Sequence, residues 1–187
     1  MDKTELKLKS AQLWHELHLS YYATKKMLIH AEEKLSAMEL YPAPLLEHRD
    51  ALDHLMRYSK IFEESGLCEA AVNELANAKQ HEIRAFYDVA DYICITIRKE
   101  ISDTLDTLSQ KKIDVVWPEY REIRVKVIDL SNRIAEIRNG TRETVDAIPS
   151  YETAVNEMFN MYAAFQTDIQ PKIGHGFFYQ LRKLFRG

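Results

Sequence analysis

Apolar residues recur along this chain at alternating spacings of three and four, the period of a helix that buries one side. The pattern predicts a first helix over about residues 4–39 and a third over about residues 69–109. A second helix is predicted over about residues 45–65, because a proline precedes it and Gly66 follows it. The predicted buried stripes of the first and third helices are, respectively, Leu17, Tyr21, Thr24, Leu28, Ala31, Leu35 and Met38, and Ile83, Phe86, Ala90, Ile93, Ile97, Ile101, Leu105 and Leu108.

The same period continues through the second half of the chain after a polar link at residues 110–114. It predicts a fourth helix from Tyr120, which ends at Pro149 and Ser150, where a fifth helix begins and runs to about Gln170. Residues 173–187 are both apolar and basic, and we expect them to form a short helix that covers one end of the bundle. The predicted stripe of the fourth helix is Tyr120, Ile123, Val127, Leu130, Ile134 and Ile137.

These elements predict an all-α fold: a bundle of about five helices, three or four of them long and coiled-coil-like, mostly antiparallel, with a short C-terminal helix. We expect a single domain over residues 1–187, since 46% hydrophobic and 29% charged residues suit one sizeable core. Five glycines and five prolines leave few turns, which excludes a loop-rich α/β fold. A helix of about 40 residues is roughly 60 Å long, more than the second helix covers, which favours a homodimer.

Charge and cysteine content narrow the function classes. The formal net charge of -4 argues against non-specific nucleic-acid binding, so contact with RNA would need a local basic patch. Cys68 and Cys94 form no ligand pair, and His15 with His18 makes only half of a metal motif, so neither a metal site nor a cofactor is expected. No signal peptide and no 18-residue apolar stretch are present. These observations predict a cytoplasmic protein whose C-terminal segment does not contact membranes.

The candidate chemistry lies in one hexapeptide of the second helix, Arg49-Asp50-Ala51-Leu52-Asp53-His54. Arginine presents a permanently charged fork that neutralises phosphate, and histidine moves protons near neutral pH. Arg49 and His54 are about 140° apart around the helix axis and could still line one groove. Arg57 follows three residues after His54 on the charged side. The other side of this amphipathic helix is apolar: Leu45, Ala51, Leu52, Leu55, Met56, Ile61 and Phe62.

The hexapeptide resembles the signature of the HEPN-family ribonucleases, an arginine, then Asn, Asp or His, then three residues and a histidine. The resemblance implies an all-helical, metal-independent endoribonuclease that acts as a dimer, of the kind found in toxin and antiphage systems. It also implies a composite site at the dimer interface. There His54 would transfer protons, Arg49 would stabilise the charge on the phosphorane, and Asp50 would orient one of them. A cognate inhibitor is a further expected partner.

A second polar stripe on the third helix, His81, Arg84, Asp88 and Asp91, has spacings of three, four and three. If the second and third helices are antiparallel neighbours, this stripe faces the hexapeptide. Arg57, His81 and Arg84 would then bind the RNA substrate. The alternative interpretation is that both polar clusters are structural ion pairs or bind an anionic ligand, in a non-catalytic module that senses or binds another protein. The sequence leaves open whether the chain is a fragment of a longer protein.

Overall fold

The computed structural model describes residues 1–35, 42–141 and 145–173, and within them every regular element is a helix. The predicted all-α fold is therefore confirmed, while the expected short C-terminal helix lies outside the described residues. The helices are α1 (Lys3–Lys34), α2 (Ala43–Ser65), α3 (Glu69–Asp106), α4 (Gln110–Val116), α5 (Tyr120–Thr141) and α6 (Ile148–Ala164). A short 3₁₀ turn, Val145–Ala147, precedes α6, and a π-helical turn, Phe165–Ile169, continues it.

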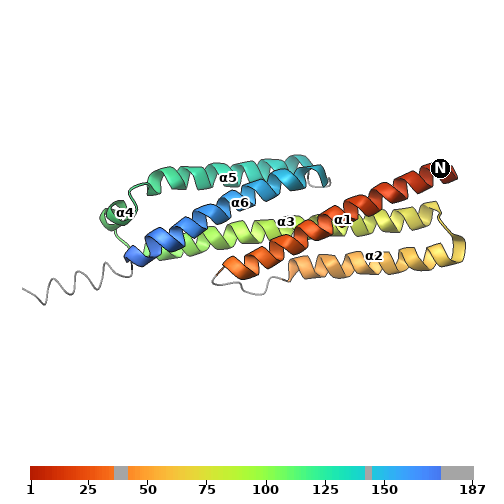
Figure 1. Cartoon of the computed structure of the whole chain (residues 1–187), viewed down its shortest axis with the longest axis horizontal. Helices are drawn as coiled ribbons and strands as arrows, with labels where there is room; N and C mark the ends of the chain where they lie inside the picture. The colour runs from red at the N-terminus through yellow and green to blue at the C-terminus, as the bar shows by residue number, and fades with distance from the viewer. Residues whose placement is uncertain (36–41, 142–144, 174–187) are drawn as a thin grey trace, which may run out of the picture.

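Helix α3 runs along nearly the whole described structure, and the other long helices are arranged around it (Figure 1). Helices α1 and α2 pack against its N-terminal part, and α6 packs against its C-terminal part with α5 on the outside. Consecutive long helices run in opposite directions, as the short connections require (Figure 1). Because α1 and α2 both rest on α3, the surface between them is lined by all three helices.

The first helix begins with a reciprocal pair of hydrogen bonds. The Asp2 carboxylate accepts from the backbone N–H of Thr4 at 2.7 Å and of Glu5 at 2.8 Å, and the Glu5 side chain accepts from the Asp2 N–H. This capping box satisfies backbone donors that lack a partner within the helix. The terminal ammonium of Met1 lies 2.7 Å from Glu69, which ties the start of α1 to the start of α3.

Two predicted boundaries were wrong. Residues 110–114, predicted as a link, begin the short helix α4, whose Ile113 is buried. Pro149 and Ser150 were predicted to separate two helices, but α6 already begins at Ile148 and Pro149 occupies its first turn. A proline at this position loses no helical hydrogen bond, because the first N–H groups have no intrahelical acceptor. Ser150 is consequently inside the helix and does not cap it.

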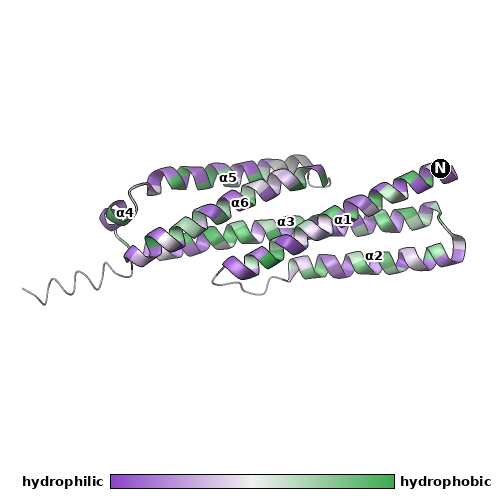
Figure 2. Cartoon of the chain, in the orientation of Figure 1, coloured by the Kyte–Doolittle hydropathy of each residue, from purple (hydrophilic) through white to green (hydrophobic). Residues whose placement is uncertain are grey.

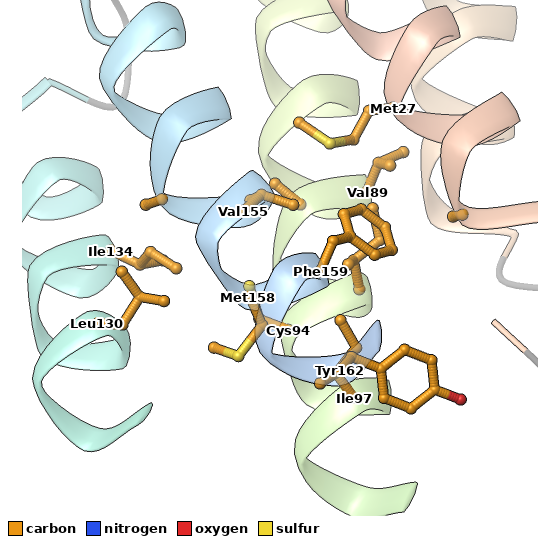
Figure 3. Close-up of a cluster of buried hydrophobic side chains, with 14 of the residues drawn as sticks. Met27, Val89, Cys94, Ile97, Leu130, Ile134, Val155, Met158, Phe159 and Tyr162 are labelled. Carbon is orange, nitrogen blue, oxygen red and sulfur yellow. The ribbon is translucent and has the colours of Figure 1, made fainter. Parts of the chain in front are cut away.

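The core follows the predicted stripes closely along α3. Of that stripe, residues from Ile83 to Ile97 are fully buried, Leu105 is 2% exposed, and Ile101 and Leu108 pack partly buried beside them. Figure 3 shows Met27 of α1, Val89 of α3 and Phe159 of α6 meeting in this cluster, with Leu130 and Ile134 of α5 beside α6. In α1, Leu17, Thr24, Ala31 and Leu35 are buried, but Tyr21 is 41% exposed. Met38 and the side chain of Ile137 lie outside the described set.

The apolar side of α2 is only partly covered, with Leu55 and Ile61 half-buried. Leu45, Leu52, Met56 and Phe62 are between 47% and 58% exposed, and only Pro44 and Ala51 of this helix are buried. In Figure 2 hydrophobic residues recur along α2, the helix at the edge of the molecule. The face of α2 that meets α3 carries Glu47, His48 and His54, which pair with polar residues of α3. The small side chain of Ala51 lets the two helices approach closely.

Candidate functional site at the α2–α3 seam

The seam between α2 and α3 begins at Gly66, the turn that reverses the chain between them. Gly66 has a φ of 69°, a backbone conformation that residues with a Cβ rarely adopt. Its N–H closes α2 by donating to the Phe62 carbonyl at 2.9 Å. The reversal places α2 antiparallel to α3, so polar residues of α2 before and after Ala51 meet the polar stripe of α3.

His54, the histidine of the hexapeptide, is fixed by a carboxylate from the neighbouring helix. Its Nδ1 lies 2.6 Å from Oε2 of Glu74, and the two side chains are 17% and 22% exposed. A carboxylate on one ring nitrogen selects the tautomer with the proton there and leaves Nε2 as the exchangeable position. No residue in the described ranges forms a hydrogen bond with Nε2 of His54.

His81 occupies a similar position on α3. Its Nδ1 lies 2.8 Å from Oε2 of Glu47 and 2.7 Å from Nη2 of Arg84, while Nε of Arg84 donates to Glu47 at 2.9 Å. One ring nitrogen cannot donate to Glu47 and accept from Arg84 at the same time, so the tautomer decides which bond forms. Glu47 bonds Arg84 in both tautomers, and it also bonds His81 in the tautomer whose proton is on Nδ1.

The two imidazole rings of His54 and His81 stack across the seam. Their centroids are 5.2 Å apart and their planes are inclined by 29°. Each side chain is about four-fifths covered, so part of each remains accessible to solvent. We call His54 and His81, with Glu74, Glu47 and Arg84, the imidazole cluster.

Arg49 does not contact His54. Its Nε and Nη2 donate to Oδ1 of the adjacent Asp50 at 2.9 and 2.7 Å, and its side chain is 68% exposed. The hydrogen bond from Arg49 lowers the pKa of Asp50, and the positive potentials of His81 and His54 lower it further. Asp50 therefore holds the guanidinium of Arg49 next to its own backbone and away from His54.

The other predicted binding residues are arranged differently. Arg84 and His81 belong to the imidazole cluster, but Arg57 pairs with Asp53 on the exposed surface of α2. Asp91, at the far end of the predicted stripe, accepts a hydrogen bond from the Tyr151 hydroxyl at 2.7 Å and so serves the other half of the molecule.

Sequence reasoning missed the carboxylates that orient the histidines. Glu47 and His54 are seven residues apart on α2, and Glu74 and His81 are seven apart on α3. Two such pairs on antiparallel helices place each acid opposite the histidine of the other helix. The signal can be found in the sequence once the second and third helices are assumed to pack side by side. A third pair, His48 with Glu82, was also missed.

Among the residues that the structure describes, no three His, Cys, Asp or Glu side chains converge in an arrangement that could hold a metal ion. In the same residues, no helix combines the length and apolar character that crossing a bilayer requires. Comparisons of the chain with family models, with curated proteins and with solved structures found no match.

Proposed function

We propose that this protein is a HEPN-like, metal-independent RNA endonuclease that acts as a dimer, of the kind that toxin and antiphage-defence systems use. The observation that carries the proposal is the stacked pair of imidazoles, His54 and His81, each with Nδ1 beside a carboxylate of the opposite helix. The motif match at Arg49, Asp50 and His54 supports the same chemistry independently of this geometry.

Metal-independent RNA cleavage needs three groups. A base takes the proton of the 2′-hydroxyl as it attacks the adjacent phosphorus, an acid protonates the departing 5′ oxygen, and a cation stabilises the charge on the phosphorane. The products are a 2′,3′-cyclic phosphate and a 5′-hydroxyl. In the proposal, His54 and His81 act as the proton acceptor and donor through their Nε2 atoms.

The arginines would supply the cationic group. Arg84 lies beside His81 and is 42% exposed, so it could bind a phosphate oxygen without losing its bond to Glu47. Arg49 donates to Asp50, but its side chain is 68% exposed, so the guanidinium has room to turn toward another molecule. In the dimer that the resemblance implies, Arg49 of one protomer would complete the charge stabilisation at the cluster of the other.

The test is cleavage of total cellular RNA, and of an oligonucleotide with a 2′-O-methyl analogue beside it, by purified protein in excess EDTA. We expect the wild type to cleave RNA, to spare the analogue and to leave cyclic phosphate ends. His54→Ala, His81→Ala and Arg49→Ala should each lower the rate by about a hundredfold or more. His15→Ala is the matched control, because His15 is exposed on α1 and lies in no part of the cluster.

The proposal would be wrong if folded wild-type protein cleaves no RNA, or if cleavage survives both histidine substitutions. Oligomeric state is measured in the same preparations by light scattering. A strictly monomeric protein that still cleaves RNA would contradict the dimeric part alone.

A second candidate function is a non-catalytic module that binds another protein. The observation that favours it is the exposed apolar surface of α1 and α2, which includes Leu8, Trp14 and Tyr22 besides the outward residues of α2. Leu45, Leu52 and Met56 recur at spacings of seven and four, so they share one side of α2, an arrangement typical of an interaction surface. In this interpretation the imidazole cluster fixes the register of α2 on α3. Loss of partner binding in Met56→Glu, with no RNA cleavage by the wild type, would support this candidate.

A further inference from the structure

A groove of about 510 Å³ lies between α1 and α2 on the other flank of the seam, with α3 as its floor. The volume is within the range of small-molecule sites, roughly 300–1,000 Å³. The walls are mainly apolar, and polar groups lie at a few positions only. The lining residues are Trp14, Leu17, His18 and Tyr21 of α1, His48, Leu52 and Leu55 of α2, and Glu82 of α3. We call it the α1–α2 groove.

The α1 wall of the groove is aromatic. Trp14 and Tyr21 are each 41% exposed, which is unusual for large rings on a helix that has a buried side available. Trp14 is held edge-on by Tyr58 at a centroid distance of 5.7 Å, and Tyr21 is held edge-on by His48 at 5.9 Å. The rings are thus fixed in orientation while part of each remains open to a ligand.

The floor of the groove contains a carboxylate with an unused acceptor. Glu82 is 5% exposed, and both of its carboxylate oxygens lie 2.9 Å from Nδ1 of His48. Only Oε1 has hydrogen-bond geometry to that nitrogen, so Oε2 lacks a hydrogen-bond donor among the described residues. A buried oxygen without a donor is costly, and in native proteins it often indicates a functional role.

We propose that the α1–α2 groove binds a small aromatic amine, with its ring between Trp14, Tyr21 and Leu52 and its amino group facing the buried carboxylate of Glu82. Aromatic walls attract both a flat ring and an adjacent cation, and the buried carboxylate supplies the complementary charge. The net charge of -4 also favours a cationic ligand over an anionic one. This inference is independent of the proposed ribonuclease activity, because the imidazole cluster lies on the opposite flank of α2.

The size of the groove suits a small molecule. Its α1 wall extends from Trp14 to Tyr21, seven residues or roughly 10 Å, and its α2 wall extends from His48 to Leu55, the same length. A single ring with a short chain fills the available length.

The test is titration of the full-length protein with phenethylamine, with 3-phenylpropionate as the probe of equal ring and chain length but opposite charge. The readout is the indole N–H resonance of Trp14, and Trp117, which is 4% exposed in the core, is the internal reference. We expect phenethylamine to shift the Trp14 resonance saturably at millimolar concentrations and to leave Trp117 unchanged. 3-Phenylpropionate should bind at least about tenfold more weakly.

Two variants test the assignment of the groove. Glu82→Gln removes the charge and should weaken phenethylamine binding by about tenfold or more. Leu52→Arg places bulk and positive charge at the mouth and should have a similar effect without disturbing the core, since Leu52 is 55% exposed. Leu45→Arg is its matched control, a leucine of α2 with 51% exposure that does not line the groove.

The inference is overturned if phenethylamine does not shift Trp14, if both probes bind equally, or if binding survives both Glu82→Gln and Leu52→Arg. A second outcome would also overturn it. In that outcome the wild type forms an oligomer that does not bind phenethylamine, and Leu52→Arg, but not Leu45→Arg, dissociates the oligomer. In that case the groove is a contact between two copies of the chain. RNA cleavage is measured in parallel, so that failure of one proposal is distinguishable from failure of the other.

Discussion

At the scale of single residues, the seam is organised by carboxylates that each fix one nitrogen of a histidine. His54 is oriented by Glu74, His81 by Glu47 and His48 by Glu82, and in every case the acid and the base come from different helices. Such pairs hold α2 on α3 in a single register while they set the ring orientation. The same contacts can therefore serve both stability and proton transfer.

Glu74 acts as a positioning residue in the proposed mechanism, so Glu74→Gln should alter His54 without removing it. We expect RNA cleavage to fall by roughly a hundredfold, because the tautomer that leaves Nε2 free to accept a proton is no longer favoured. The ¹⁵N shifts of His54 should report a mixture of tautomers in the variant and protonation mainly at Nδ1 in the neutral wild-type ring. Glu64→Gln, an exposed substitution on α2, the helix of His54, is the control. Unchanged ¹⁵N shifts would contradict the positioning role.

The two cysteines should differ sharply in reactivity. Burial raises the pKa of the Cys94 thiol to about 12, and the negative charge of Asp91 adds to the effect. Since the thiolate is the reactive form, iodoacetamide at about pH 8 should label Cys68, which is partly exposed, and leave Cys94 unmodified. Peptide mass spectrometry before and after denaturation measures this directly. Equal labelling of both cysteines in the folded protein would show that α3 and α5 open readily around Cys94.

His30 gives stability a pH dependence of known sign. Burial, chiefly, and the positive charge of Lys34 lower its pKa below the ordinary value of 6.5, and its ring stacks on Phe159 at 4.6 Å. Below about pH 6.5 the unfolded chain binds a proton that the folded ring resists, so stability is complete above that pH and declines as pH falls. His30→Phe should reduce the decline in melting temperature between about pH 7 and about pH 5. His15→Phe, at an exposed site, should leave it unchanged.

The residue types of the candidate site could be predicted from the sequence, but most of their contacts could not. The motif singled out Arg49, Asp50 and His54, and the stripe on the third helix singled out His81 and Arg84. The stacking of His54 on His81 depends on the register of two helices, which the Gly66 turn and the small Ala51 decide together. Arg49 donates to Asp50 and not to His54 because of how the side chains are oriented, and the spacing of these residues in the sequence does not determine that orientation.

At the scale of helices, periodicity predicted which side of α3 is buried, whereas much of the apolar side of α2 is exposed. An apolar stripe indicates a side that can be buried, and the partner determines whether it is. The stripe of α3 faces apolar sides of α1 and α6, so prediction and structure agree there. The face of α3 that α2 contacts carries Glu74, His81 and Glu82, so the two helices meet through polar contacts. The exposed apolar residues of α2, Leu45, Leu52, Met56 and Phe62, consequently face outward.

The packing of α2 on α3 leads to a prediction about two substitutions. Ala51 is 1% exposed at the close approach of α2 to α3, so Ala51→Leu should destabilise the protein by about 1–3 kcal/mol through overpacking. Leu52→Ala, at the next residue, should change stability by less than about 0.5 kcal/mol, because Leu52 is largely exposed. Urea unfolding followed by circular dichroism measures both. The reverse order of effects would mean that α2 packs through its apolar side.

At the scale of the whole molecule, α3 is shared by two groups of helices with separate cores. The larger core joins α3 to α6, α5 and the C-terminal part of α1, and the smaller one joins the start of α3 to the start of α1. In the smaller core the buried residues are Leu6, Leu13, Leu17, Val72, Leu75 and Ala78. The large aromatic side chains, which contribute most buried area, belong to the larger core.

This division predicts unequal local stability. Amide hydrogens of α2 and of the first turns of α1 should exchange with deuterium through partial opening, whereas those around Ile93 and Phe159 should exchange only through global unfolding. Hydrogen exchange measured by mass spectrometry at low denaturant separates the two classes. Protection of α2 equal to that of α3 would show that the seam unfolds together with the larger core.

The π-helical turn at Phe165–Ile169 affects how the length of this helix can change during evolution. A π turn holds one residue more than an α turn, and it is how a helix absorbs an insertion without forming a loop. Phe165 and Ile169 are both buried on either side of the exposed Thr167, so the extra residue bulges toward solvent while the flanking positions keep their orientation. Helix α6 therefore tolerates a change of one residue in length at this point, and relatives that lack the residue would retain the same buried face.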